Sequence, residues 1–303
     1  MTRKHFLFDI LSMAVALLAV SCSTVSDDTA IANLKENPYR GHAAKPLIIA
    51  VYHPYPDFAT TVAAAVRPLP GYDGWSDSRM DRDMRRMRDC GINGVLLSIK
   101  PEDLADAVRF ARIRRFYELA AMQQPVFNVA LMLGGNNELA LGNVLQFIQR
   151  KGLADFPSAM AINGRKVVVF NNSVRLSQSG KDGDETFCYR HIGKDWPTLP
   201  EGKLLCRPSA TDGFVWVKAG DNHAVQDANG VPDGLNEQEI WSLPRDKGRN
   251  FANRLRHALK ERAAIIGIQS WNDFSDGSFM EPNTLDRNIM TTVLQRELGI
   301  LAK

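Results

Sequence analysis

The sequence predicts an α/β fold, and specifically a (β/α)8 TIM barrel that forms a single domain. Short apolar runs of strand length alternate along the chain with longer segments of helical periodicity, and this alternation is typical of a parallel sheet. Each apolar run is followed at once by polar, aromatic or glycine-rich residues, which a barrel gathers on its C-terminal face. About 280 residues follow Cys22, and undivided barrels commonly reach this length. An open doubly wound sheet is the alternative, but it would not bring the strand ends from both halves of the chain together.

The first 22 residues have the pattern of a lipoprotein signal peptide. Arg3 and Lys4 form a basic start, and residues 6–20 are an apolar core of signal-peptide length. Residues 19–22, Ala-Val-Ser-Cys, resemble a bacterial lipobox with Cys22 as the lipidated residue. The apolar run is too short to favour a membrane-spanning anchor. We therefore predict a bacterial lipoprotein of the cell envelope, periplasmic or anchored at the outer membrane, that contacts membrane through its lipid only.

Residues 23–44 are polar and without strong periodicity, so we interpret them as a tether and assign the barrel to residues 45–303. The formal net charge is only +3, and the sequence has no basic patch interleaved with aromatic residues. Binding to nucleic acid is therefore not predicted. The cysteines show no C-x-x-C spacing, which argues against a zinc site, and Cys188 with Cys206 is one candidate disulfide pair. Residues 227–230 begin like a calcium loop but lack its third ligand and its glutamate. We expect no cofactor and no metal, and we expect a monomer.

The first predicted strand, residues 46–52, is a nearly continuous apolar run, as expected for a parallel strand covered on both faces. It ends in a proline-containing loop that cannot continue as a helix. Tyr52, His53 and Tyr55 at this exit are predicted to bind the ligand. The alternative is that the two tyrosines cover the end of the barrel and contact no ligand.

A methionine stripe marks the first helix of the barrel. Met80, Met84 and Met87 are spaced four and three residues apart, which places them on one helical face. Such a stripe is typical of core packing. The predicted elements of this part are a helix at 77–91, a strand at 94–99 and a helix at 102–122.

Two strand exits in the middle of the chain carry asparagine. The first opens into Gly134 and Gly135, where paired glycines let the backbone approach a ligand, and Asn136 follows them. Asn171 stands at the second exit, and we predict that Asn136 and Asn171 line the same cleft. The sequence contains neither a G-x-G-x-x-G nor a Walker pattern, so this loop is not predicted to bind a nucleotide. The predicted elements are a strand at 126–133, a helix at 139–151 and a strand at 166–170.

The region after the fourth strand is less regular. Residues 173–202 are rich in Gly, Asp and Lys, which predicts a long surface loop or a small insertion. A later strand contains Trp216 and leaves Lys218 and His223 at its polar end; all three are predicted to bind substrate. The later strand is 213–217, and the two remaining strands are assigned to 203–206 and 238–241.

The most informative stretch is residues 264–282. It opens as an apolar, β-branched run, which predicts a buried strand, and then turns polar at once with Asn272, Asp273, Asp276 and Glu281. Three carboxylates this close repel one another, so at least one should hold its proton to an unusually high pH. A protonated and an ionised carboxyl group are what glycoside hydrolysis needs. The alternative is that these side chains cap a turn and the next helix. The flanking helices are predicted at 248–262 and 285–298.

Residues 271–282, WNDFSDGSFMEP, resemble the W-N-[DE]-[WFY]-x-E-[GS]-x-[YF]-[IL]-x-P signature of glycoside hydrolase families 71 and 99. Looser similarity covers residues 47–55 and 79–99. Those families are (β/α)8-barrel enzymes that act on α-linked glycans, and their two acidic residues three apart are the catalytic pair. Carried over by position, the pair falls on Asp273 and Asp276. The departure is Asp276, because both families have glutamate there.

The resemblance implies that Asp276 is the general acid and Asp273 the base. In family 71 the base activates water with inversion, whereas in family 99 it assists attack by the sugar's own 2-hydroxyl with net retention. Asp273 is closer to the first family, and Gly277 and Glu281 are closer to the second, so the stereochemistry stays open. The remaining candidate substrate contacts on this loop are Trp271, Asn272, Phe279 and Glu281. Asn272 would also orient Asp273.

The sequence thus predicts an envelope-anchored glycoside hydrolase that acts on oligo- or polysaccharides of the α-mannan or α-glucan type. The alternative is a non-catalytic glycan-binding surface lipoprotein, for which the shorter acid at position 276 is the supporting feature. A purely structural envelope lipoprotein is the third possibility, and it would lack a carboxylate-lined cleft.

Overall fold

A computed structural model describes residues 45–56, 66–135, 138–177, 186–196, 208–209, 212–220 and 245–301. Several predictions fall outside these residues. They are the signal segment 1–22 with Cys22, the tether 23–44, Asn136, Cys206, His223 and the candidate strands 203–206 and 238–241.

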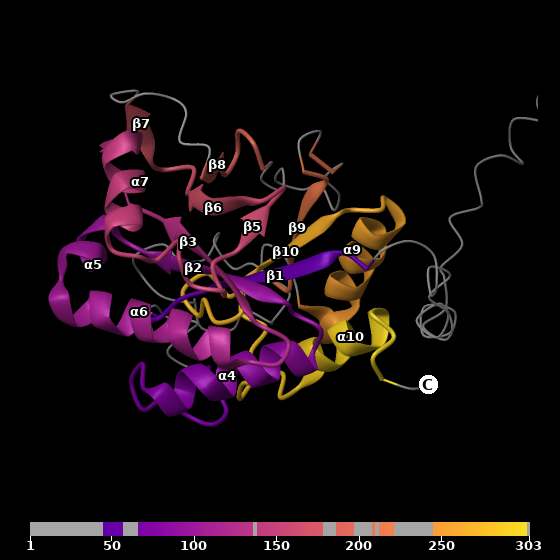
Figure 1. The fold of residues 1–303 in the computed structure, drawn as a ribbon. Helices are drawn as coiled ribbons and strands as arrows, with labels where there is room; N and C mark the ends of the chain where they lie inside the picture. Colours follow the sequence, from indigo (N-terminus) through magenta and orange to yellow (C-terminus); the bar gives the residue numbers. More distant parts are fainter. Residues whose placement is uncertain are drawn as a thin grey trace, which may run out of the picture. The chain divides into compact units, whose positions relative to one another are not determined.

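A curled sheet forms the centre of the fold (Figure 1). Its first strand pairs in parallel with its last, Leu47 opposite Ile265, while the other strands of the parallel series follow one another in chain order. Pairing of the first strand with the last is a feature of a (β/α)8 barrel, and the curled sheet of parallel strands confirms the predicted fold class. In spatial order the parallel strands are β8 (Phe187–His191), β6 (Arg165–Phe170), β3 (Asn128–Leu133), β2 (Gly94–Ile99), β1 (Leu47–Tyr52), β10 (Ile265–Gln269) and β9 (Phe214–Lys218), and the short β5 (Ala161–Ile162) pairs antiparallel with β6.

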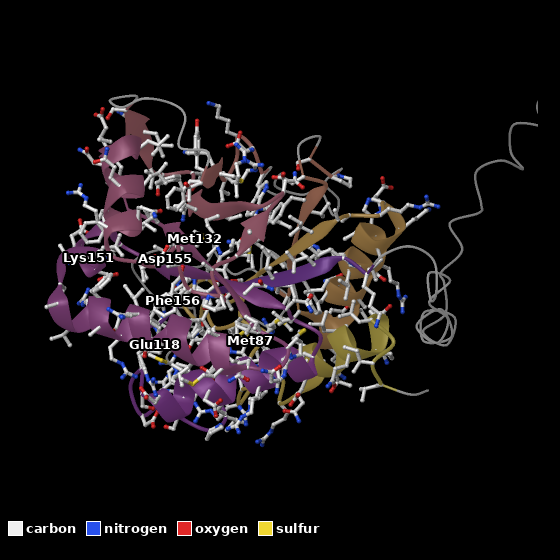
Figure 2. The ribbon with its side chains drawn as sticks, viewed as in Figure 1. Met87, Glu118, Met132, Lys151, Asp155 and Phe156 are labelled. Atoms are coloured by element: carbon white, nitrogen blue, oxygen red, sulfur yellow. The ribbon has the colours of Figure 1, made fainter. Side chains whose placement is uncertain are left out.

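Helices cover the sheet, and their buried faces follow the predicted periodicity. Met80, Met84 and Met87 are fully buried, as the methionine stripe predicts. Figure 2 shows side chains filling the space between the sheet and these helices, with Met87 among them. The helices are α4 (Asp77–Asp89), α5 (Pro101–Ala105), α6 (Ala107–Met122), α7 (Leu141–Arg150), α9 (Arg249–Lys260) and α10 (Ile289–Glu297), with the short 3-10 turn η2 (Asp246–Gly248) before α9.

Large aromatic side chains fill the interior of the curled sheet between β8, β9 and β10. Phe214 stacks on Trp196 with ring centroids 4.1 Å apart and meets Trp216 edge-on at 4.7 Å. Gly267 leaves room for them, because a Cβ there would lie 2.5 Å from Phe214 Cζ and 2.6 Å from Trp216 Cε3. Trp216 is therefore a packing residue of the buried core. This corrects the prediction that it contacts substrate.

Two of the predicted segments differ from the structure. The stretch 173–202 contains β8 and β7 (Arg175–Ser177), which pairs with β4 (Glu138–Ala140). The helix predicted at 102–122 is divided because the Asp106 side chain caps a new helix by accepting from Val108 N and Arg109 N.

Within the described part of the chain, no helix has the length and apolar character needed to cross a membrane.

Candidate active site

The loop that follows β10 is held firmly at the C-terminal end of the sheet. Trp271 N donates to Val51 O at 2.8 Å, which extends the pairing between β10 and β1. The loop closes on itself through Ser270 N to Ser278 O at 3.0 Å and Met280 N to Ser270 O at 3.1 Å. Its backbone conformation is therefore set by hydrogen bonds at both ends.

Asp273 lies on this loop with one carboxylate oxygen directed at His53. Its Oδ1 accepts from Ser275 N at 3.0 Å and from Ser275 Oγ, and its own N–H donates to Ser270 Oγ at 2.6 Å. The remaining oxygen, Oδ2, lies 3.3 Å from His53 Nε2. Both side chains are partly exposed, so this pair is open to a ligand.

Asp276, three residues further on, has a different environment. It is 6% exposed, and Ser278 N donates to its Oδ1 at 2.8 Å. Burial raises its pKa to about 6, and the nearby charge of Asp273 contributes in the same direction. The positive charge of Lys218 on β9 opposes this rise. Asp276 therefore retains a proton at a pH where an exposed aspartate has lost it.

His53 is fixed by Asn272 through its backbone. His53 N donates to Asn272 Oδ1 at 2.8 Å, and Asn272 Nδ2 donates back to His53 O at 2.8 Å. Asn272 is fully buried. It therefore holds the chain after β1 in place, and this corrects both the predicted substrate contact of Asn272 and its predicted role in orienting Asp273.

Strand alternation brings further polar side chains to the same end of the sheet. His53 continues the inward-facing series of Ile49 and Val51, and Lys218 continues that of Phe214 and Trp216. Asn171 continues the inward-facing residues of β6. Ser98 and Gln269 are the last inward-facing residues of β2 and β10. Ser98 and Gln269 were not among the predicted site residues, although the two-residue alternation of a strand, counted from its buried inward residues, points to them. These partly exposed strand-end residues are His53, Ser98, Asn171, Lys218 and Gln269.

Three predicted sugar-binding aromatics are fully buried: Tyr52, Trp271 and Phe279. Tyr52 faces the helices and packs on the ring of Phe116 with centroids 5.3 Å apart. Phe279 stacks on Phe274 at 4.5 Å within the loop. The predicted substrate contacts of these three residues are therefore corrected, because burial leaves no ring face accessible to a sugar.

Tyr55 differs from the other aromatics because 53% of it is exposed. It lies two residues beyond His53 and meets Trp75 edge-on, with ring centroids 5.6 Å apart. Tyr55 is therefore the predicted aromatic whose ring remains accessible.

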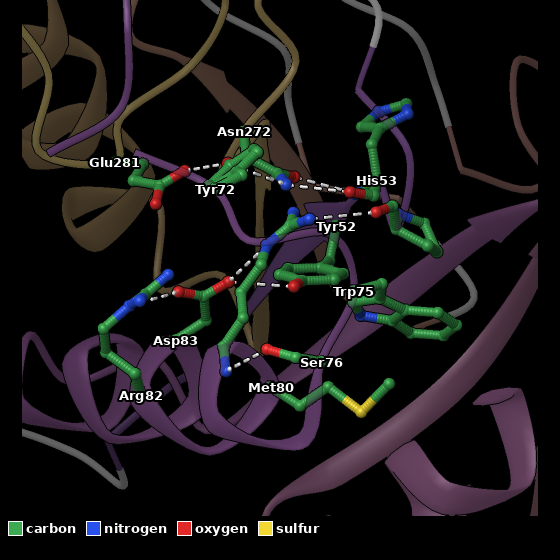
Figure 3. Close-up of polar contacts among 12 residues, drawn as sticks. Tyr52, His53, Tyr72, Trp75, Ser76, Met80, Arg82, Asp83, Asn272 and Glu281 are labelled. Carbon is green, nitrogen blue, oxygen red and sulfur yellow. Dashed lines mark hydrogen bonds and ion pairs between the residues drawn. The ribbon is translucent and has the colours of Figure 1, made fainter. Parts of the chain in front are cut away.

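A buried polar cluster lies beside the loop (Figure 3). Its members are Tyr52, Arg79, Asp83 and Glu281, which are buried, and Tyr72, which is partly exposed. Tyr72 Oη donates to Glu281 Oε2, and Tyr52 Oη donates to Asp83 Oδ2 at 2.9 Å. The Arg79 guanidinium lies 3.5 Å from the centroid of the Tyr72 ring and 3.4 Å from Asp83 Oδ2.

Glu281 is fully buried in this cluster, so the prediction that it binds a substrate hydroxyl is corrected. Burial raises its pKa to about 8, and the charge of Asp83 adds to the rise. Tyr72, its hydrogen-bond partner, was missed because it stands in an irregular stretch with no pattern that sets it apart.

Glu281→Gln is expected to reduce the loss of stability with rising pH. The folded protein keeps the Glu281 proton up to about pH 8, whereas the ordinary value is 4.5. Between these values the folded state binds more protons than the unfolded state, so the free energy of unfolding falls as the pH rises, by on the order of a few kcal/mol. Glutamine cannot ionise and loses this contribution. Urea unfolding from about pH 5 to pH 8 measures it, and parallel curves for the two proteins would contradict the expectation.

In the described part of the chain, no group of three or more His, Cys, Asp or Glu side chains is placed so that it could hold a metal ion.

Comparison with known proteins finds likeness in structure. No family model matches the chain, and no curated protein matches it in sequence. Two structures of the GH99 endo-α-mannosidase from Bacteroides thetaiotaomicron, one of them in complex with bis-tris-propane, superpose with TM-scores of 0.61 at 12% and 11% identity. The alignments cover 85% and 86% of this chain and 98% and 100% of those chains. A glycoside hydrolase-like protein has a TM-score of 0.56 at 12% identity, covering 86% of this chain and 98% of that chain. The chain therefore shares the barrel fold of these proteins.

Proposed function

We propose that this chain is a glycoside hydrolase that acts on α-linked glycans, with Asp276 as the general acid and Asp273 as the general base. The observation that carries the proposal is the pair of carboxylates on one loop in unlike environments. Asp276 is buried with a pKa raised to about 6, whereas Asp273 is partly exposed beside His53. Two carboxyl groups separated in this way divide the acid and base roles between them.

The chemistry follows from these positions. Asp276 would donate its proton to the glycosidic oxygen as the bond to the leaving sugar breaks, because the departing alkoxide is otherwise too basic to leave. Asp273 would accept a proton from the attacking hydroxyl group, either that of water or the 2-hydroxyl of the sugar. Hydrogen bonds from Ser275 hold Oδ1 of Asp273, which leaves Oδ2 for this task next to His53.

The substrate class is supported by the structural neighbours, which are described as endo-α-mannosidases, and by the sequence signature of residues 271–282. Tyr55, two residues beyond His53, offers an exposed ring on which a sugar could stack. Asn171, Lys218 and Gln269 supply polar groups at the strand ends. We infer that an α-mannan or α-glucan oligosaccharide binds here.

The experiment that tests the function is a screen for release of reducing ends from α-mannans and α-glucans by the purified protein. Release from at least one α-linked glycan is expected. The second candidate function is glycan binding without hydrolysis, which the low exposure of Asp276 favours. Binding of a glycan that is not cleaved would select this second function.

We further propose that Cys22 carries a lipid and holds the protein at the cell envelope. The supporting feature is the basic and apolar leader that ends in a lipobox-like sequence. Cys22→Ala is expected to abolish metabolic labelling with palmitate and to leave the precursor uncleaved. Equal labelling of both forms would end this proposal.

A further inference from the structure

We propose that Tyr72 and Glu281 are positioning residues that hold His53 against Asp273, acting through Asn272. The inference rests on the proposed function, because it assigns Asp273 as the base. None of the three relay groups (Tyr72, Glu281 and Asn272) is proposed to contact substrate: Glu281 and Asn272 are fully buried, and the Tyr72 hydroxyl is bonded to both of them.

The hydrogen bonds of Asn272 fix the orientation of its amide. Its Oδ1 accepts from His53 N, and its Nδ2 donates to His53 O at 2.8 Å and to Tyr72 Oη at 3.3 Å. Both the acceptor and the donor side of the amide are thus in use. If the amide were flipped, its N–H donor would face the His53 N–H donor, and its oxygen would face the His53 carbonyl oxygen.

Tyr72 sets the direction of this chain of hydrogen bonds. It donates its one proton to Glu281 Oε2, so its oxygen is left to accept from Asn272 Nδ2. Burial holds the pKa of Tyr72 well above its usual value, so the phenol stays protonated. The chain therefore runs in one sense, from Asn272 through Tyr72 to Glu281.

Arg79 braces the same segment from a second side. Its guanidinium lies over the Tyr72 ring at 3.5 Å from the centroid and donates to Pro54 O at 3.2 Å and Gly74 O at 3.0 Å. Pro54 directly follows His53. The exit of β1 is therefore held at two adjacent residues, His53 by Asn272 and Pro54 by Arg79. Asn272 and Arg79 both contact Tyr72.

The functional consequence is the position of the His53 side chain. Its Nε2 lies 3.3 Å from Asp273 Oδ2, and the backbone of His53 is tied to the Asn272 amide. Misplacement of a reacting group by about 1 Å can cost about 10²-fold in rate. Loss of the Tyr72 hydroxyl is expected to loosen this geometry without removing any group that touches substrate.

The test compares Tyr72→Phe with Tyr52→Phe. Both remove a phenol hydroxyl that donates to a buried carboxylate of the same cluster, but only Tyr72 is bonded to Asn272. With the six histidines labelled by nitrogen-15, amide hydrogen exchange of His53 reports the Asn272 contact directly. Exchange at His53 should accelerate by about tenfold in Tyr72→Phe, the effect of about one hydrogen bond. In Tyr52→Phe it should stay within about twofold of wild type.

Kinetics supply the second readout. On a glycan that the wild type cleaves, Tyr72→Phe should lower kcat by about tenfold with little change in KM, and His53→Gln should make the effect of Tyr72→Phe disappear. Glu281→Gln, which keeps an acceptor oxygen, should preserve His53 protection, whereas Glu281→Leu should reduce it as Tyr72→Phe does. Unchanged His53 exchange in Tyr72→Phe, or equal acceleration in Tyr52→Phe, would overturn the proposal. Exchange is measured without substrate, so this arm decides the relay even if no glycan is hydrolysed.

Discussion

Asp276→Asn is expected to lower kcat on an α-linked oligosaccharide by about 10² to 10⁴-fold, the usual contribution of a general acid. The amide has the size of the carboxyl group and its oxygen can still accept from Ser278 N, so the loop should keep its conformation. Glycan affinity should therefore change by no more than about threefold. The variant lacks only the proton that the leaving oxygen needs.

The dependence on leaving group distinguishes this role from others. An aryl glycoside that releases an acidic phenol needs no protonation, so Asp276→Asn should cleave it at a rate within about tenfold of wild type. For the wild type, kcat/KM on the natural glycan should fall above about pH 6, because Asp276 loses its proton there. Equal losses on both substrates would contradict an acid role for Asp276.

Asp273→Asn is the second large effect that we expect, again about 10² to 10⁴-fold on kcat. Asparagine can still accept at Oδ1 from Ser275 N, so the local fold should be retained. It cannot take a proton from the attacking hydroxyl group. Because the attacking hydroxyl group must give up its proton whichever group leaves, the loss should be similar for the oligosaccharide and for the aryl glycoside.

Two observations would separate Asp273 from a structural role. Melting temperature and glycan affinity should match the wild type, which shows that the site is formed. Turnover of Asp273→Asn within tenfold of wild type on both substrates would remove Asp273 from the mechanism. The two variants should also be non-additive, because the acid and base act in one reaction.

The parts of the fold that the sequence predicted are those with strong local patterns. The apolar runs at β1, β2, β3, β6 and β10 stand out because these strands are buried on both faces. By contrast, only the first two residues of β8 are buried and the strand lies in a polar stretch, so the sequence predicts an irregular segment there. The last helix begins at Ile289 because Asn283 Oδ1 accepts from Leu285 N and Asp286 N and holds a turn there.

The candidate site was predictable where residues share one loop and unpredictable where burial depends on distant packing. Asp273 and Asp276 are neighbours in sequence, so their unlike environments could be anticipated from mutual repulsion. Tyr52 is buried against the helices and the adjacent His53 lies at the site, because successive strand residues face opposite sides of the sheet. Which of the two faces the helices depends on the partner Asp83, which is 31 residues away.

The central claim is that this loop performs hydrolysis and does more than bind sugar. The most direct measurement is hydrolysis and binding of the same α-linked oligosaccharide by wild type and by Asp276→Asn. We predict that both proteins bind it with affinities within about threefold and that only the wild type releases reducing ends at a substantial rate. Binding by both proteins without release by the wild type would contradict the claim and leave a glycan-binding protein.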